Sequence, residues 1–340
     1  MKRIALEEHF VTEKQLAYLR SRKDYPRLES AVDEKGSLVE RLARTPSSSR
    51  IFSAEDVQKL LDVGSGRIAE MDRAGITMQV LSNSGPSVEE YDAAVRSDLA
   101  RSINDELSEA VRRHPDRFAG LATLAYGDPR AAADELERCV VKLALKGAKI
   151  NSHVGGEYLD DRKFWPLFER AEALGVPIYL HPKEPPPGLS KFFAPYAALA
   201  APMWGFSVDA SLHAMRLICS GLFDQYPNLT IILGHLGEGI PFWLWRIDNR
   251  WVKDRHTGLK KRPSEYFRAN FRVTTSGMFS DAALQCVHQA IAADNILFAV
   301  DYPFESSEEA VSFMDAAALS AADKEKICHA NAEALLSLPA

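Results

Sequence analysis

Short apolar runs rich in valine, isoleucine and leucine recur along the chain, and each run ends in polar residues. Such runs are typical of strands buried in a parallel sheet. Eight runs fit this description, at residues 4–9, 78–84, 119–125, 147–152, 177–182, 230–237, 272–277 and 296–303. Between them, apolar residues recur at intervals of three and four, which predicts helices over residues 54–74, 98–114, 128–143, 164–175, 209–223 and 280–294.

Eight strands that alternate with helices close most economically into a (β/α)8 TIM barrel, an α/β fold. The chain length of 340 residues fits one such barrel as a single domain, residues 1–340. An open doubly wound sheet is the alternative, but it normally has fewer strands, and no GxGxxG motif follows any of the eight.

Two connections are too long to be simple turns: residues 11–53 after the first strand and residues 183–208 after the fifth. Both leave the carboxyl ends of strands, where barrel enzymes keep their sites. We therefore expect two insertions beside the site that act as lids or binding loops, with a surface flap as the alternative for the first.

Composition narrows the class of partner. The net charge is −6, with no basic block, which argues against nucleic acid and anionic membranes and favours a small-molecule substrate. No apolar run approaches the roughly 20 residues that span a bilayer, and the first residues do not form a secretion signal, so we expect a cytoplasmic protein. Four cysteines without CxxC spacing are interpreted as reduced core residues.

Candidate metal ligands stand at the ends of the predicted strands. Glu7 and His9 share one face of the first strand, because side chains alternate along a strand, and Glu8 takes the opposite face. Later strands end in His181, His235 and Asp301. One such histidine alone is more often structural, but carboxylates and imidazoles gathered at one barrel face suit Zn²⁺, Mn²⁺ or Fe²⁺ with open positions. The pattern predicts one divalent metal ion and no organic cofactor.

Five segments, in order along the chain, resemble one family: ALEEHF, PIYLHP, IILGHLGEGIPFWLWRID, TTSG and ILFAVDYPFE. They are similar to the amidohydrolase-related nonoxidative decarboxylases of hydroxylated benzoates, such as the γ-resorcylate, 2,3-dihydroxybenzoate and 5-carboxyvanillate decarboxylases. The resemblance implies that the metal ligands are Glu7, His9, His181 and Asp301. It also implies a homo-oligomer, either a dimer or a tetramer.

The same resemblance implies catalytic roles for His235 and Glu238 of the GHxGE segment, together with Asp301. It implies that Arg246 contacts the substrate, with an ordinary helix ion pair as the alternative. Asn151 and Phe304, at the ends of the fourth and eighth strands, are further candidate substrate contacts.

Three features qualify the resemblance. His9 follows the resorcylate type, whereas INSHVGGEYLDD is more similar to the carboxyvanillate type, so the ring substrate stays open. Residues 85–89 read GPSVE where relatives usually carry Ala-Pro and a Val-Gln pair, which predicts a different side pocket. Lys149 stands where binuclear amidohydrolases carry a bridging lysine, but relatives in this family do not require it.

The predicted reaction is metal-dependent nonoxidative decarboxylation of an ortho-hydroxylated aromatic carboxylic acid. Direct loss of CO₂ would leave an aryl carbanion that the ring cannot stabilise, so a proton is first added to the ring carbon, by Asp301 or by His235. Glu238 would orient His235, with a helix-dipole carboxylate as the alternative. The alternative function is a hydrolase of an amide, ester or lactone, and a third is an inactive metal-bearing binding protein.

Overall fold

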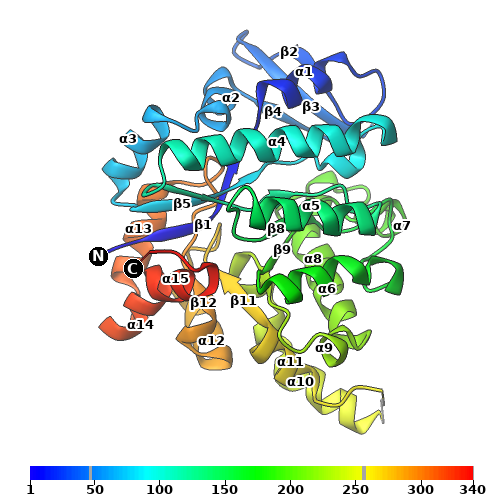
Figure 1. Cartoon of the computed structure of the whole chain (residues 1–340), viewed down its shortest axis with the longest axis vertical. Coiled ribbons are helices and arrows are strands. Elements are labelled where there is room, and N and C mark those ends of the chain that lie inside the picture. Colours follow the sequence, from blue (N-terminus) through cyan, green and yellow to red (C-terminus); the bar gives the residue numbers. More distant parts are fainter. Residues whose placement is uncertain (46–47, 255–257, 340) are drawn as a thin grey trace.

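The computed structural model describes residues 1–45, 48–254 and 258–339. Parallel strands form a closed barrel surrounded by helices, with both termini at the end where the strands begin (Figure 1). Strands pair in the order β1-β5-β6 and β7-β8-β9-β10-β11-β12. The strands are β1 (Ile4–Phe10), β5 (Met78–Asn83), β6 (Phe118–Gly120), β7 (Ala122–Thr123), β8 (Ala148–Asn151), β9 (Ile178–His181), β10 (Ile231–Leu233), β11 (Phe271–Thr274) and β12 (Ile296–Leu297).

The barrel closes between its first and last strands. The backbone N–H of Leu6 donates to the carbonyl of Phe298 at 3.1 Å, that of His9 to Tyr302 at 2.8 Å and that of Asp301 to Glu7 at 3.0 Å. Strands β6 and β7 are two parts of one predicted strand, so the barrel has eight strand positions. The (β/α)8 prediction is confirmed.

Helices cover the outside of the barrel. The predicted helical stretches all contain helices, and additional helices occur in the two insertions, between β10 and β11, and after β12. The α-helices are α1 (Glu13–Ser21), α2 (Ala54–Leu61), α3 (Ser65–Ala74), α4 (Ala93–Arg113), α5 (Pro129–Val141), α6 (Trp165–Leu174), α7 (Pro187–Ser190), α8 (Gly205–Cys219), α9 (Leu222–Gln225), α10 (Ile240–Lys253), α11 (Pro263–Asn270), α12 (Asp281–Ile291), α13 (Ser307–Ala316), α14 (Ala321–Glu325) and α15 (Asn331–Leu336). Short 3-10 turns and one π-helical turn (Lys326–Ala330) join them.

The first long connection is more ordered than the sequence predicted. After α1 it forms an antiparallel sheet of β2 (Arg27–Val32), β3 (Leu38–Thr45) and β4 (Ser48–Phe52), at one end of the molecule in Figure 1. These strands were missed because they alternate buried and exposed residues over only short stretches rather than forming apolar runs. The second connection carries α7 and short 3-10 turns before α8.

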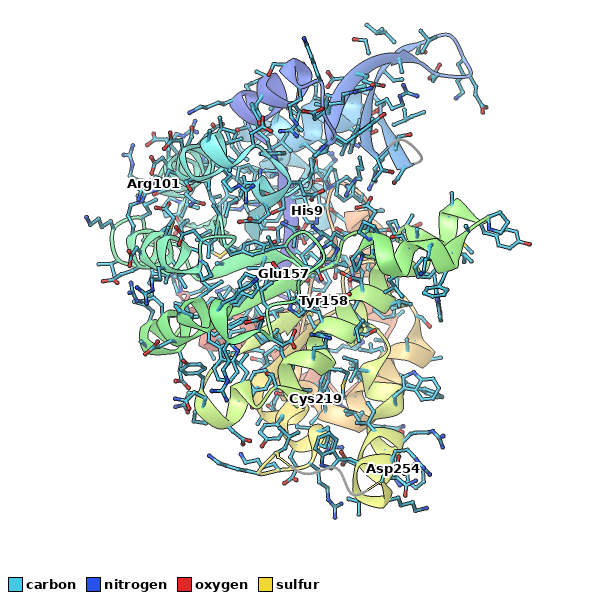
Figure 2. All side chains as sticks on the ribbon, turned by 90° about the vertical axis from the view of Figure 1, so that its right-hand side faces the viewer. His9, Arg101, Glu157, Tyr158, Cys219 and Asp254 are labelled. Carbon is cyan, nitrogen blue, oxygen red and sulfur yellow. The ribbon has the colours of Figure 1, made fainter. Side chains whose placement is uncertain are left out.

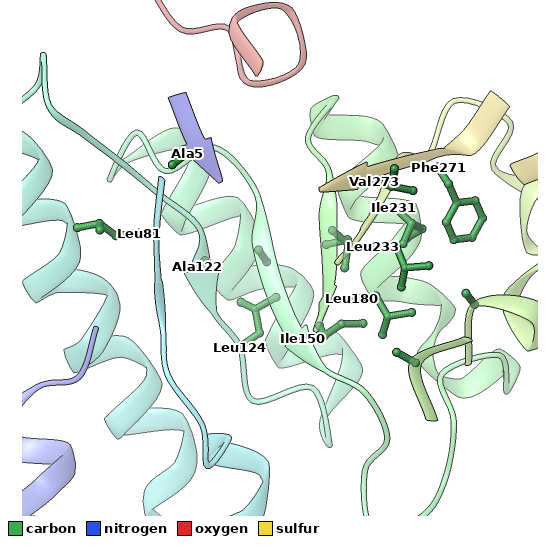
Figure 3. Close-up of a cluster of buried hydrophobic side chains, with 14 of the residues drawn as sticks. Ala5, Leu81, Ala122, Leu124, Ile150, Leu180, Ile231, Leu233, Phe271 and Val273 are labelled. Carbon is green, nitrogen blue, oxygen red and sulfur yellow. The ribbon is translucent and has the colours of Figure 1, made fainter. Parts of the chain in front are cut away.

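Alternate strand residues face the barrel interior and the helices. The layer between strands and helices holds residues such as Leu81, Ile150, Leu180 and Val273 (Figure 3). A separate inner cluster includes Ile4, Leu6, Met78, Val80, Tyr179, Ile232, Leu297 and Ala299. Because side chains alternate along a strand, the neighbours of each inward-facing residue point toward the helices.

Strand β1 breaks this alternation, and the break decides which glutamate faces the site. Ile4 and Leu6 face inward, which would turn Glu8 inward too, but β1 contains one extra residue relative to β5 between Ala5 and Glu8. The bulge reverses the facing, so Glu7 points inward. Glu8 instead accepts hydrogen bonds from the backbone N–H groups of Val300 (2.9 Å) and Tyr302 (3.3 Å).

Among the described residues, no helix is long and apolar enough to cross a membrane.

Candidate metal centre

Three predicted ligands meet at the carboxyl end of the barrel. One ligand atom from each of Glu7, His9 and His181 lies within 4.8 Å of the other two. Figure 2 views this end of the molecule and shows His9 near its middle, below the inserted sheet. Glu7 and His9 come from β1, and His181 comes from β9. The barrel therefore brings together residues that are far apart in the sequence; Glu7 and its hydrogen-bond partner Tyr179, for example, are 172 positions apart.

Glu7 is a buried carboxylate with one oxygen fully used and one left open. The hydroxyls of Tyr179, Thr274 and Ser276 all donate to Oε2, whereas Oε1 has no hydrogen-bond partner among the described residues. Gly234 makes room for this arrangement, since a Cβ there would lie 3.1 Å from Glu7 Oε2. Burial raises the pKa of Glu7. A buried carboxylate oxygen without a donor fits a bound cation.

The two histidines have the protonation that a metal requires. His181 Nδ1 lies 2.7 Å from the carbonyl oxygen of Pro182 and therefore carries the proton, which leaves Nε2 as a lone-pair donor 3.4 Å from Glu7 Oε1. Burial lowers the pKa of His181 well below its usual value, and burial with the nearby Lys149 lowers that of His9 to about 4. Both imidazoles are neutral at pH 7, as ligands must be.

Asp301 lies between His9 and His235. Its Oδ1 is 2.8 Å from His9 Nε2, and its Oδ2 is 4.0 Å from His235 Nε2. Burial raises the pKa of Asp301, but the nearby His235 imidazolium and the hydrogen bond with His9 outweigh burial and lower it. Asp301 adjoins the Glu7, His9 and His181 cluster through His9, and the carboxylate is ionised beside these imidazoles.

His235 is held by a carboxylate behind it. Its Nδ1 lies 2.7 Å from Glu238 Oε1, and the Glu238 side chain is buried. Burial lowers the pKa of His235, but the charges of Glu238 and Glu7 outweigh burial and raise it well above its usual value. The geometry leaves Nε2 directed toward Asp301, so this imidazole can donate a proton or a hydrogen bond in that direction.

The backbone is strained at both of these residues, and also at Leu236 and Glu238 beside His235. Asp301 has φ 82° and His235 has φ 49°, both in the left-handed region that non-glycine residues rarely adopt. Each such residue costs of order 1–3 kcal/mol, and strain of this kind clusters at functional sites.

A cavity opens above these groups. It is lined by six of the residues singled out in the sequence: His9, Asn151, His181, His235, Asp301 and Phe304. Glu7 lies beneath the cavity and Glu238 lies behind His235, so neither is part of the lining. The hydroxyl of Tyr126 bonds to both the backbone N–H (3.0 Å) and the carbonyl (3.1 Å) of Asn151, which fixes that strand end.

Within one chain, Arg246 lies away from the cavity that it was predicted to contact. It is exposed on α10 and does not line the cavity. The helix packs through Ile240 and Leu244, and Arg246 lies off that buried face. The motif in the sequence indicated a substrate contact but not the direction of the side chain.

Sequence reasoning also missed the residues that the insertions contribute. Arg44 and Arg50 of the inserted sheet line the cavity, together with Phe52 and Lys183. The Arg44 guanidinium pairs with Glu184 at 2.7 Å, and the Arg50 guanidinium lies 4.0 Å from the centre of the Phe304 ring. No motif marked them, and only the placement of the insertion beside the site indicated where to look.

Lys149 is buried beside the ligands rather than at the surface. Its Nζ lies 3.3 Å from His9 Nδ1, and burial lowers its pKa to about 7. His153 and His213 are buried as well but do not line the cavity.

Comparison with known proteins identifies the family of this chain. Residues 62–338 match the amidohydrolase family. The chain belongs to that family. Among its amidohydrolase relatives, a γ-resorcylate decarboxylase from Polaromonas sp. is 39% identical over 99% of this chain and 98% of the relative.

Solved structures agree with this assignment. The 5-carboxyvanillate decarboxylase from Sphingomonas paucimobilis has a TM-score of 0.88 and 36% identity, with 99% of each chain covered. A dihydroxybenzoic acid decarboxylase from Polaromonas sp., solved with manganese and the inhibitor 2-nitroresorcinol, has a TM-score of 0.86 and 37% identity, covering 99% of this chain and 97% of that chain. The predicted resemblance to the amidohydrolase-related decarboxylases is confirmed.

Proposed function

We propose that this amidohydrolase is a metal-dependent nonoxidative decarboxylase of an ortho-hydroxylated aromatic carboxylic acid. The observation that carries the proposal is the cluster of Glu7, His9 and His181, with Asp301 alongside, at the floor of a cavity whose wall contains two arginines. The identities of its relatives as decarboxylases support the same activity.

Glu7, His9, His181 and Asp301 would hold one divalent ion, Zn²⁺ or Mn²⁺. The open oxygen of Glu7 and the neutral imidazoles of His9 and His181 fit such an ion. When bound, the ion supplies Lewis acidity that favours the phenolate form of the substrate and neutralises its carboxylate.

The chain's own groups move the proton. The His235 imidazolium supplies the proton, and the ring carbon that bears the carboxyl group receives it either directly from His235 or through Asp301, whose Oδ2 lies 4.0 Å from His235 Nε2. The C–C bond then breaks, its electron pair returns to the ring, and CO₂ leaves as aromaticity is restored. Glu238 keeps the proton of His235 on Nδ1 or stabilises the imidazolium.

Asn151 and Phe304 would position the ring, and Arg44 and Arg50 would attract and orient its negatively charged groups. A guanidinium suits this task because it offers two parallel N–H groups to one carboxylate. Their charges make the cavity selective for anions although the whole chain has a net charge of −6.

Arg246 would contact substrate only across an interface. Its helix exposes Phe242 (69%), Trp243 (52%) and Trp245 (76%), a cluster of aromatic side chains that a homo-oligomer would cover. We therefore propose a dimer or tetramer in which Arg246 of one subunit approaches the cavity of another. Sedimentation equilibrium tests this, and a monomer at micromolar concentration would contradict it.

We further propose that the chain works as one domain in the cytoplasm. The four cysteines are free, as expected for a reducing compartment.

The activity is tested by following CO₂ release from a panel of hydroxybenzoates, including 2,6-dihydroxybenzoate, with enzyme loaded with Mn²⁺ or Zn²⁺. We expect turnover of ortho-hydroxylated acids that stops when the metal is chelated and returns when it is restored. Turnover of simple esters or lactones with no CO₂ release from any aromatic acid would replace this proposal with the hydrolase alternative.

A further inference from the structure

A buried polar network lies behind the metal centre. It consists of Glu8 on β1, Arg67 on α3 and Gln79 on β5, all at most 1% exposed. The Arg67 guanidinium donates to Gln79 Oε1 at 3.2 Å, and the Gln79 side-chain nitrogen lies 3.5 Å from Glu8 Oε2. None of the three is among the residues that line the cavity, so the network does not bind the substrate directly.

Stability alone does not explain a network of this kind. Taking a carboxylate and a guanidinium out of water is unfavourable, and hydrocarbon of similar volume in their place is often neutral or stabilising. The contacts of Glu8 and Arg67 show what the two charged groups hold instead. Both reach the backbone of residues that carry the metal centre.

Glu8 holds the backbone on both sides of Asp301. Its Oε1 accepts from the N–H of Val300 at 2.9 Å, and its Oε2 accepts from the N–H of Tyr302 at 3.3 Å. The N–H between them, that of Asp301, donates to the carbonyl of Glu7 at 3.0 Å. Three consecutive N–H groups are therefore fixed to two neighbouring residues of β1.

The backbone of Asp301 needs such support. Its φ of 82° is unfavourable for a residue with a Cβ, and a conformation of this kind persists only where surrounding contacts fix it. Relaxation of this φ would move the carboxylate, whose Oδ1 lies 2.8 Å from His9 Nε2. At the other end of the network, the Arg67 guanidinium donates to the carbonyl of His9 at 2.6 Å, so the backbone of a second ligand is held as well.

We propose that Glu8 is a positioning residue for the metal centre, which fixes the backbone around Asp301 so that the Asp301 carboxylate reaches the bound ion. The inference rests on the metal centre of the proposed function. Glu8 touches neither the ion nor the substrate and acts through Asp301. Removal of partners that hold metal ligands typically weakens metal binding by roughly 10–100-fold.

The test measures the Mn²⁺ affinity of the metal-free enzyme by calorimetric titration. Glu8→Gln keeps the shape of the side chain but offers one oxygen and one NH₂ group, so one of the two backbone N–H groups faces another donor. We expect the Kd for Mn²⁺ to rise about tenfold or more. Unchanged affinity in folded Glu8→Gln would overturn the inference.

Glu135→Gln is the matched control. Glu135 is also a buried carboxylate, but it lies on the outer helix α5 and accepts hydrogen bonds from Arg138 at 2.8 and 2.9 Å. Loss of this charge should lower the Tm and leave the Mn²⁺ affinity at the wild-type value. An equal loss of Mn²⁺ affinity in both variants would mean that any buried carboxylate has this effect, which would overturn the inference.

A second variant covers the case in which Glu8→Gln does not fold. Glu8→Asp keeps the negative charge near Arg67, but its carboxylate is one methylene short of the two N–H groups. Its Kd for Mn²⁺ should rise about threefold or more. If Glu8→Gln does not fold, wild-type affinity in Glu8→Asp overturns the inference.

A double-mutant cycle separates positioning from a general loss of structure. If Glu8 acts through Asp301, Glu8→Gln should change the Kd for Mn²⁺ by less than about twofold once Asp301→Ala is present. The full effect of Glu8→Gln in that background would show that Glu8 acts elsewhere and would overturn the inference.

The titration needs no turnover, so the two proposals fail separately. Unchanged Mn²⁺ affinity in the Glu8 variants, with CO₂ still released by wild type, would overturn the positioning role and leave the decarboxylase intact. If no aromatic acid loses CO₂ while Glu8→Gln still weakens Mn²⁺ binding, the decarboxylase proposal fails and the positioning role stands.

Discussion

The cavity has two walls of different origin. The inner wall is formed by the ends of barrel strands, where Glu7 and His9 are buried, His181 is half-buried, and hydroxyl and backbone contacts hold Glu7 and His181. The outer wall comes from the inserted sheet, which contributes Arg44 and Arg50. The barrel strands carry the candidate metal ligands, while the insertion contributes the arginines that line the outer part of the cavity. Changes at the inner wall should therefore abolish turnover, and changes at the outer wall should alter substrate preference.

The largest expected effect is at the inner wall. Asp301→Asn removes a negatively charged ligand and a candidate proton donor, so turnover should be abolished while the circular dichroism spectrum and Tm stay close to wild type. Glu305→Gln, an exposed carboxylate four residues later, is the matched control and should retain activity. Wild-type rates in Asp301→Asn would remove Asp301 from the mechanism.

His235→Ala should lower kcat by about 100-fold or more, because it removes a group that transfers a proton or stabilises charge. Glu238→Gln leaves the imidazole in place and should produce a smaller loss with a shifted pH profile, since the charge that raises the His235 pKa is gone. The measurement is kcat across pH 5 to 9 for both variants. A negligible loss in His235→Ala would make this histidine structural.

The outer wall should respond differently. Arg50→Ala should raise KM about tenfold or more with a small change in kcat, because it removes a charge-assisted contact with the bound acid rather than a reacting group. Arg41→Ala, an exposed arginine on the neighbouring strand that pairs with Glu29, is the control. A loss confined to kcat would place Arg50 with the chemistry and weaken the division between the walls.

The last expected effect concerns stability rather than turnover, at helix α8 beside the cavity. Helix α8 carries Phe206 to the cavity, and its Asp209 accepts a hydrogen bond of 2.6 Å from the Tyr158 hydroxyl. Burial raises the pKa of Asp209 to about 6, above its usual value of 3.8. Its protonated form therefore stabilises the fold fully below pH 3.8, and this contribution is lost as pH rises through 6, by roughly 2–3 kcal/mol.

Asp209→Asn should remove that pH dependence. The free energy of unfolding, measured by urea titration at pH 4 and pH 7, should change less between these values in the variant than in wild type. Equal changes in both proteins would show that Asp209 does not titrate in this window.

The same division explains what could be predicted from the sequence. The barrel strands appear as continuous apolar runs because both faces are buried, and the candidate ligands follow at their ends. The residues of the inner wall could therefore be predicted from the sequence. The facing of Glu7 was predicted correctly, but simple alternation from Ile4 and Leu6 would have turned it outward, and the bulge in β1 that restores it has no marker in the sequence.

The outer wall could not be predicted in the same way. The inserted strands are short and half exposed, so their period is weak, and Arg44 and Arg50 resemble ordinary surface residues until the sheet lies over the barrel. The direction of the Arg246 side chain could not be predicted for a related reason, since the motif fixes its position in the chain but not the side of α10 on which it lies.

The most direct test of the central claim is an anomalous difference map from crystals of the enzyme grown with Mn²⁺ and collected at the manganese edge. The account predicts one strong peak at the floor of the cavity, about 2.0–2.3 Å from Glu7 Oε1 and from Nε2 of His9 and of His181, with Asp301 completing the ligand set. A peak elsewhere, or none in crystals of active enzyme, would contradict it.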